Sequence, residues 1–193
     1  MRNLWLLLVI PVVVISCDGK PKSKSSGYEA LVPDSLICAT INNFVNDTSI
    51  HEFQNCNRFV DKDFRKVLLK EDSLVILRLD SIFTKEDMDF IFRQNLNSVY
   101  FRSGKCLKNK VLISADTLLN FEIMEFWPKF RKKYGEGGYC SISMPLFSVN
   151  HDIVIIRYSR NNGRLNASGV TYIFKKSNGK WIKIYCIDAW ISW

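Results

Sequence analysis

The chain has little of what most catalytic sites are built from. It contains only two histidines, His51 and His151, and no Gly-x-Ser-x-Gly motif. The glycines at 135, 137 and 138 lack the Lys-Ser/Thr pair that a phosphate-binding loop requires. These absences argue against an α/β-hydrolase, a P-loop enzyme and a dinucleotide-binding fold.

The sequence also lacks the spacing of metal ligands. No Cys-x-x-Cys or His-x-x-x-His pair occurs, and the cysteines from Cys38 onward stand at least 18 residues apart. We therefore expect neither a metal site nor a cofactor.

No apolar run is long enough to cross a bilayer. The longest stretch, residues 4–15, would rise about 18 Å as a helix, whereas the hydrocarbon core is about 30 Å thick. Pro11 interrupts the run, and the chain turns polar directly after Cys17. A retained transmembrane helix is therefore disfavoured.

What the first 17 residues do contain is an export signal. Arg2 supplies the basic start, residues 4–15 the apolar segment, and Ser16 a small residue before Cys17. The tetrapeptide Val14-Ile15-Ser16-Cys17 resembles the lipobox of bacterial lipoprotein precursors. That resemblance implies cleavage after residue 16 and a diacylglyceryl group on the Cys17 thiol. A plain signal peptide with a coincidental cysteine is the alternative.

The rest of the chain has the size of one domain. Residues 17–27 are rich in Lys and Ser, which predicts a flexible tether after the lipidated cysteine, and residues 28–193 form a single folding unit. The net charge of +8 is spread along the chain, so we expect no nucleic-acid partner. The predicted location is the cell envelope, with the membrane as partner through Cys17; the sequence does not say which membrane.

The remaining cysteines are odd in number. Setting Cys17 aside leaves five, so at least one lies outside any disulfide of the monomer, and their spacing does not choose among the possible pairings. Cys186 falls in an apolar strand pattern, which predicts a buried, inert thiol. The five are Cys38, Cys56, Cys106, Cys140 and Cys186.

Helical patterns dominate the first part of the mature chain. Apolar residues recur on one helix face over residues 33–45, and Thr84 with Asp87 predicts a capped helix over 84–96. Residues 117–127 predict another helix that Pro128 ends or bends. Residues 129–134 add one more turn, closed by Gly135.

Two short segments there are predicted as strands. Residues 74–79 are rich in β-formers, and residues 99–113 suggest a pair of strands. Residues 49–70 are ambiguous between helix and strand.

Four β-like runs follow one another over residues 139–188. Turn-like separators lie between them at residues 148–150, 161–163 and 177–179, and the last two contain Asn-Gly. Strict alternation would place Ile182, Ile184 and Cys186 on a face that covers the helices. The predicted fold is therefore α+β, with N-terminal helices packed on a C-terminal antiparallel meander of about four strands.

The end of this meander, Asn178-Gly179-Lys180-Trp181, resembles the final hairpin of NTF2-like domains, which often finish in a Gly-x-Trp strand. The resemblance covers about twenty residues and implies a ligand pocket behind the sheet, without naming its residues.

Few groups remain as catalytic candidates. Cys140 with His151 is one Cys/His pair that a hairpin would bring together, and His151 is followed by Asp152. Three carboxylate pairs, Asp61/Asp63, Asp87/Asp89 and Glu122/Glu125, fit helix caps or exposed helix faces. We assign no catalytic residue and expect a lipid-anchored envelope protein whose domain binds or scaffolds a protein or glycan. An exported hydrolase with an unidentified site is the alternative.

Overall fold

The computed structural model describes residues 31–47, 56–61, 66–119 and 125–192. It is an α+β fold, as the sequence predicted, and it is built on one seven-stranded sheet. The helices are α1 (Asp34–Asn46), α2 (Lys70–Ile76), α3 (Lys85–Asn97), α4 (Ala115–Leu119) and α5 (Phe126–Tyr134). The strands are β1 (Arg58–Val60), β2 (Val111–Ile113), β3 (Tyr139–Ile142), β4 (Leu146–Phe147), β5 (Ile153–Gly163), β6 (Asn166–Ser177) and β7 (Lys180–Ser192).

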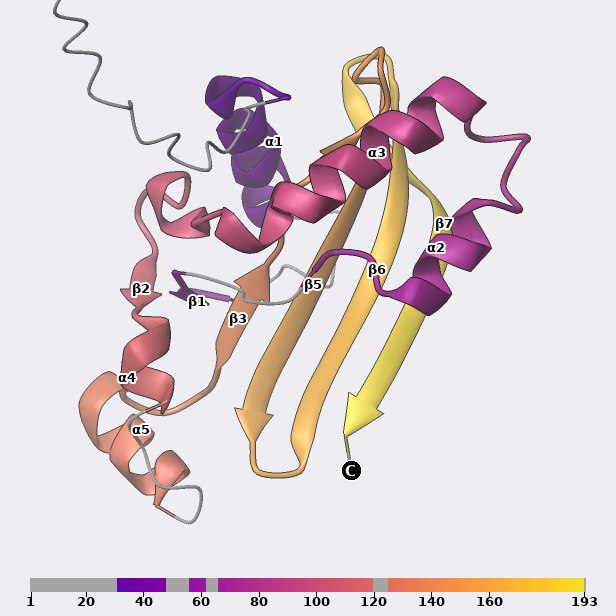
Figure 1. Cartoon of the computed structure of the whole chain (residues 1–193). Coiled ribbons are helices and arrows are strands. Elements are labelled where there is room, and N and C mark those ends of the chain that lie inside the picture. The colour runs from indigo at the N-terminus through magenta and orange to yellow at the C-terminus, as the bar shows by residue number, and fades with distance from the viewer. Residues whose placement is uncertain (1–30, 48–55, 62–65, 120–124, 193) are drawn as a thin grey trace, which may run out of the picture.

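The sheet is mixed, which the sequence did not reveal. Its order is β2-β1-β3-β5-β6-β7 (Figure 1). β4 pairs with β5 beyond the end of β3. β1 runs parallel to β2 and β3, whereas β3 to β7 pair antiparallel, as predicted for a meander.

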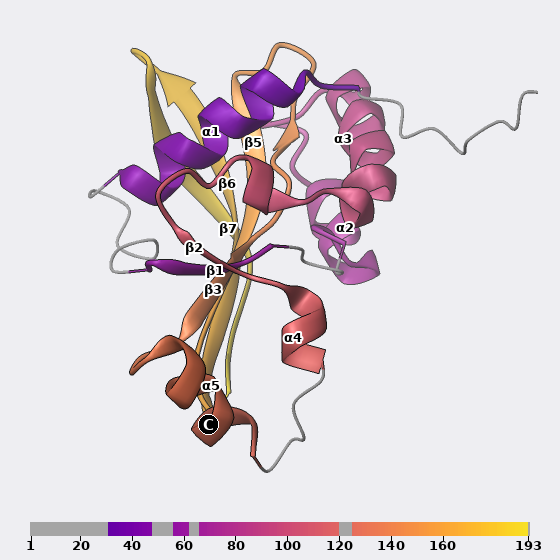
Figure 2. The ribbon, with the colours of Figure 1, turned by 90° about the vertical axis from the view of Figure 1, so that its left-hand side faces the viewer.

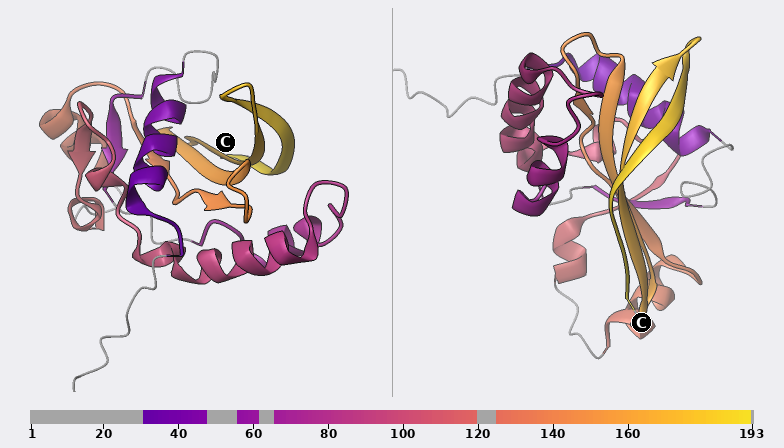
Figure 3. Two further views of the ribbon diagram at one scale, coloured as in Figure 1. Left: turned by 90° about the horizontal axis from the view of Figure 1, so that it is seen from above. Right: turned by 90° about the vertical axis from the view of Figure 1, so that its right-hand side faces the viewer.

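Helices cover both faces of one half of the meander. Figures 2 and 3 show α1 on one side of β5 and β6, and α2 with α3 on the other. Phe44 of α1 packs on Phe174 of β6, with ring centroids 4.6 Å apart, and lies 6.0 Å from Trp181 of β7. The predicted helix face accounts for this packing, because Ile37, Ile41 and Phe44 are all fully buried.

The cap predicted at Thr84 is present. The Asp87 N–H donates to the Thr84 hydroxyl at 3.1 Å, and the Thr84 N–H donates to Asp87 Oδ2 at 3.0 Å. This reciprocal pair satisfies two of the free donors at the start of α3.

The strand predicted at 74–79 is wrong, because α2 occupies its first half and a turn follows. Asp72 and Ile76, one helical turn apart, are buried, while Leu74 and Leu77 are exposed. The Leu69 N–H donates to Asp72 Oδ2 at 2.8 Å, which fixes the helix start. A short apolar run does not by itself distinguish a strand from one face of a helix.

The strand pair predicted at 99–113 is also wrong in part. Residues 98–100 and 103–105 form 3-10 turns, and only β2 is a strand. Its partner is β1, with Arg58 opposite Val111, so the pairing is parallel and not local. Between α4 and α5, residues 120–124 of the predicted helix lie outside the described residues.

Pro128 does not end a helix. It lies in the first turn of α5, where the missing N–H removes no hydrogen bond, and α5 runs on to Tyr134. Gly135 closes α5 with φ of 82°, as predicted.

The turn at Asn178-Gly179 is confirmed, and both residues have positive φ (51° and 78°). The turn predicted at 161–163 is displaced, because β5 continues to Gly163, which pairs with Asn166. The loop is therefore Arg164-Leu165.

The prediction for the faces of β7 is wrong: Ile182, Ile184 and Cys186 are exposed, whereas Trp181 packs against the core. Alternation along a strand separates two faces but does not decide which of them packs on the core. The register of β7 against β6 also shifts between Thr171 and Tyr172 and again between Ile173 and Phe174.

Two disulfides join segments that lie far apart in the sequence. Cys38 of α1 pairs with Cys106, which follows the second 3-10 turn, and Cys56, just before β1, pairs with Cys140 of β3. Cys186 belongs to neither, and the prediction that its side chain is buried is wrong. Within the described ranges, no helix is both long and apolar enough to cross a bilayer.

Candidate functional site

Cys17, the predicted lipidation site, and the tether behind it lie outside the described residues.

The Cys140 and His151 pair is wrong as a catalytic arrangement. Cys140 is joined to Cys56 in a disulfide, so it has no thiolate to act as nucleophile. His151 lies in the turn before β5, next to the end that carries Val154, while Cys140 pairs with Arg160. Six residues of strand separate these positions, which is about 20 Å.

His151 and Asp152 do not orient each other either. The His151 ring packs on Phe147 and Phe90, with centroid distances of 5.7 and 6.4 Å. Asp152 Oδ1 instead accepts a hydrogen bond from the Ser148 hydroxyl at 2.9 Å. Both residues therefore shape the turn between β4 and β5.

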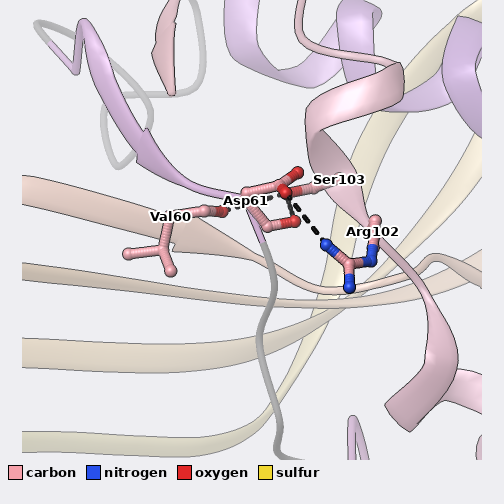
Figure 4. Close-up of polar contacts among 4 residues, drawn as sticks. All are labelled: Val60, Asp61, Arg102 and Ser103. Atoms are coloured by element: carbon pink, nitrogen blue, oxygen red, sulfur yellow. Dashed lines mark hydrogen bonds and ion pairs between the residues drawn. The ribbon is translucent and has the colours of Figure 1, made fainter. Parts of the chain in front are cut away.

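Asp61 has a structural role at the end of β1. Its Oδ2 lies 3.5 Å from Arg102 NH1, and the Ser103 hydroxyl donates to the Val60 carbonyl at 3.1 Å (Figure 4). A Cβ at position 104 would overlap the Asp61 carboxylate, so Gly104 provides the space for it. These contacts hold the 3-10 turn against β1. Asp63, the predicted partner, lies outside the described residues.

The other carboxylate pairs are also not assembled as catalytic pairs. Asp87 caps α3, as the sequence predicted, and Glu125 forms an ion pair with Lys129 one turn along α5. Glu122 lies outside the described residues.

Hydrogen bonding perturbs the pKa of Asp87. Burial by itself would raise the pKa of this carboxyl, but hydrogen bonds from the Thr84 hydroxyl, the Val149 N–H and the Thr84 N–H together lower it below its usual value. The ionised form of Asp87 is therefore part of the folded structure.

The structure instead brings two arginines to one cavity, which we call the arginine pocket. It measures about 340 Å³ and lies where β1, β2, β3 and β5 meet the loop between α5 and β3. Its lining residues are Cys56, Asn57, Arg58, Val111, Glu136, Gly137, Gly138, Cys140, Arg160 and Asn162.

Among the described residues, each arginine of the pocket donates one hydrogen bond. Arg58 NH1 donates to the Glu136 carbonyl at 2.6 Å, and Arg160 Nε donates to Asn162 Oδ1 at 3.0 Å. Both side chains are half-buried. Within the described ranges, neither guanidinium forms an ion pair with a carboxylate.

The glycines beside the pocket are required by its geometry. Gly137 has φ of 95°, and a Cβ there would lie 3.2 Å from Arg58 NH1. A Cβ on Gly138 would overlap the Asn161 carbonyl of β5. The loop can therefore approach Arg58 and β5 only because these positions carry no side chain.

A second hollow, the aromatic hollow, adjoins the arginine pocket. It measures about 300 Å³ and lies over the halves of β5, β6 and β7 that end near the C-terminus. Arg160 lines both cavities. The residues that line the aromatic hollow are Tyr158, Arg160, Ser168, Gly169, Val170, Tyr172, Ala189, Trp190 and Ile191.

No pattern in the sequence indicates the arginine pocket. Arg58 falls in the stretch that was ambiguous between helix and strand, and Arg160 is 102 positions further along the chain. The two meet because Phe59 lies opposite Cys140, and Cys140 lies opposite Arg160. In the part of the chain that the structure describes, no group of three or more His, Cys, Asp or Glu side chains is placed to bind a metal ion.

Comparison with known proteins identifies no relative: no family model, no curated protein and no solved structure matches this chain significantly.

Proposed function

We propose that this chain is a lipid-anchored protein of the bacterial cell envelope whose α+β domain binds a ligand. The signal at residues 1–16 would direct export, and Cys17 would carry the lipid. Two or more acyl chains on that residue would hold the protein firmly at the membrane, since each buried methylene contributes about 0.8 kcal/mol.

The observation that supports export most directly is the pair of disulfides. Four cysteines of the domain are paired in two bridges that join α1 and β1 to distant parts of the chain. Such bridges form and persist in oxidising compartments outside the cytosol.

Binding is favoured over the hydrolase alternative by what the cavities contain. Cys140 lines the arginine pocket but is already bonded to Cys56. The groups that converge there are guanidiniums and amides, which hold a ligand by charge and hydrogen bonds.

The lipid anchor is tested by replacing its cysteine. Cells expressing Cys17→Ala, and labelled with palmitate, should accumulate an unprocessed precursor without label. The matched control is Cys186→Ala, which removes the exposed cysteine outside the two disulfides and should be processed and labelled normally. Label in the Cys17→Ala protein would overturn the proposal.

A further inference from the structure

We propose that the arginine pocket binds an anionic group, a carboxylate or a phosphate, carried on a small sugar-sized ligand. This inference rests on the proposed binding function and names the chemistry of the ligand. It does not depend on how the protein is anchored.

Most hydrogen-bond donors of Arg58 and Arg160 have no acceptor among the described residues. A guanidinium carries five N–H donors and is always charged at physiological pH. Arg58 donates one of them to Glu136, and Arg160 donates one to Asn162. Most donors of both groups therefore remain available in a cavity, in the fork geometry that matches carboxylate and phosphate oxygens.

The charge that lines the cavity also favours an anionic ligand. Glu136 is the one acidic residue among the described lining residues, but its side chain is 88% exposed and its Oε2 lies 3.6 Å from Arg131. Arg58 contacts the Glu136 carbonyl and not its carboxylate. The pocket thus keeps a positive charge, and partial burial reduces the screening of that charge by water.

The walls of the pocket are fixed before a ligand arrives. The Cys56–Cys140 disulfide joins two lining residues across β1 and β3. Gly137 and Gly138 hold the loop closely against Arg58 and β5, as described above. A preformed site loses less conformational entropy on binding than one that must order its loops.

The aromatic hollow indicates how the rest of the ligand would lie. Because Arg160 lines both cavities, a ligand whose acidic group is held in the arginine pocket can extend along β5 over Tyr158 and Val170. An apolar and aromatic surface beside a charged group can pack against the uncharged face of a sugar ring.

The experiment is a calorimetric titration of the full chain, purified in detergent. The probes are glucuronate, glucose 6-phosphate, inorganic phosphate and neutral glucose. We expect saturable binding of the anionic probes, weaker at higher salt, and no binding of glucose. If the two acidic sugars bind more tightly than inorganic phosphate, the sugar ring contributes to the affinity. Equal affinities would show that the site recognises the anionic group alone, which would contradict the sugar-sized ligand.

Variants locate the binding. Arg58→Gln and Arg160→Gln should each raise the Kd of glucuronate at least tenfold. Arg164→Gln is the matched control, since Arg164 lies exposed in the β5–β6 turn and its loss changes net charge equally. Arg160→Lys keeps the charge but not the fork geometry, and should also weaken binding. Thermal unfolding of each variant would verify that it is folded.

Two results would overturn the inference. The first is the absence of saturable binding of every anionic probe at concentrations up to about 100 mM. The second is an equal Kd of glucuronate for Arg160→Gln, Arg160→Lys and Arg164→Gln. Neither result bears on palmitate labelling at Cys17. The failure of this inference and the failure of the lipid anchor are therefore separate outcomes.

Discussion

The Gln94 side chain forms both of its strong hydrogen bonds with the backbone of a single residue, Phe147. Gln94 Nε2 donates to the Phe147 carbonyl at 2.8 Å, and the Phe147 N–H donates to Gln94 Oε1 at 3.0 Å. The neighbouring Asn95 does the same with Leu68, at 3.0 Å for each bond. All four bonds are buried, so α3 fastens β4 on one side and the segment before α2 on the other.

Gln94→Leu should therefore destabilise the protein by about 2–4 kcal/mol, because it leaves a buried N–H and a buried carbonyl without partners. Urea unfolding of the wild type and the variant measures the difference. Leu96→Gln is the control: Leu96 is 62% exposed on the same helix, and its replacement should change stability by less than about 0.5 kcal/mol. A Gln94 variant as stable as this control would show that β4 does not depend on the amide.

The cap at Asp87 predicts a dependence of stability on pH. Its folded pKa lies below the usual value, so the stabilisation is complete above the unfolded pKa, near 4, and is lost as the pH falls through the folded pKa. Asp87→Asn should cost about 1–2 kcal/mol at pH 7. The difference from wild type should shrink below about pH 4.

Unfolding free energies measured at pH 7 and near pH 3 would test this. Asp89→Asn, two residues along α3, is the comparison and should show neither the loss nor the pH effect. A difference that stayed constant with pH would contradict the role given to the ionised carboxylate.

The Trp190 ring occupies the space that a side chain on residue 169 would fill. A Cβ at position 169 would overlap the indole, which sits across from it in the β6–β7 register. Gly169→Ala should displace Trp190, lower the melting temperature by several degrees and change the tryptophan fluorescence. Gly163→Ala should do neither, because a Cβ there makes an ordinary contact of 3.7 Å with Asn166.

The disulfide between Cys38 and Cys106 spans 68 residues of chain. Replacing both cysteines by serine should lower stability by about 4 kcal/mol, the chain-entropy value for a loop of this length.

Alkylation of the unreduced wild type, followed by peptide mass spectrometry, should modify the exposed Cys186 and leave the other four domain cysteines unmodified. Alkylation of Cys38 or Cys56 without reduction would contradict the pairing.

Local signals in the sequence were sufficient where local contacts decide the structure. The Thr84 cap, the Asn178-Gly179 turn and the apolar face of residues 33–45 each depend on neighbours within a few residues, and each prediction is confirmed. Such features follow from backbone preferences and from periodicity alone.

The predictions failed where contacts between distant segments determine the structure. Which face of β7 is buried depends on distant contacts such as that of Trp181 with Phe44 of α1, and the parallel pairing of β1 with β2 joins segments about 50 residues apart. The arginine pocket requires β1, β3 and β5 to lie in that order, which no short pattern specifies. The candidate site therefore became visible only in the fold.

The order of the bonded cysteines along the chain has a consequence for maturation. The partners alternate, since Cys56 lies between Cys38 and Cys106, and Cys106 lies between Cys56 and Cys140. A polypeptide oxidised from its amino end would have Cys38 and Cys56 available together, before the native partner of either has emerged. A bridge between those two must then be exchanged through mixed disulfides before the native pattern can form. Efficient production of this protein should accordingly depend on a thiol isomerase, and not on an oxidant alone.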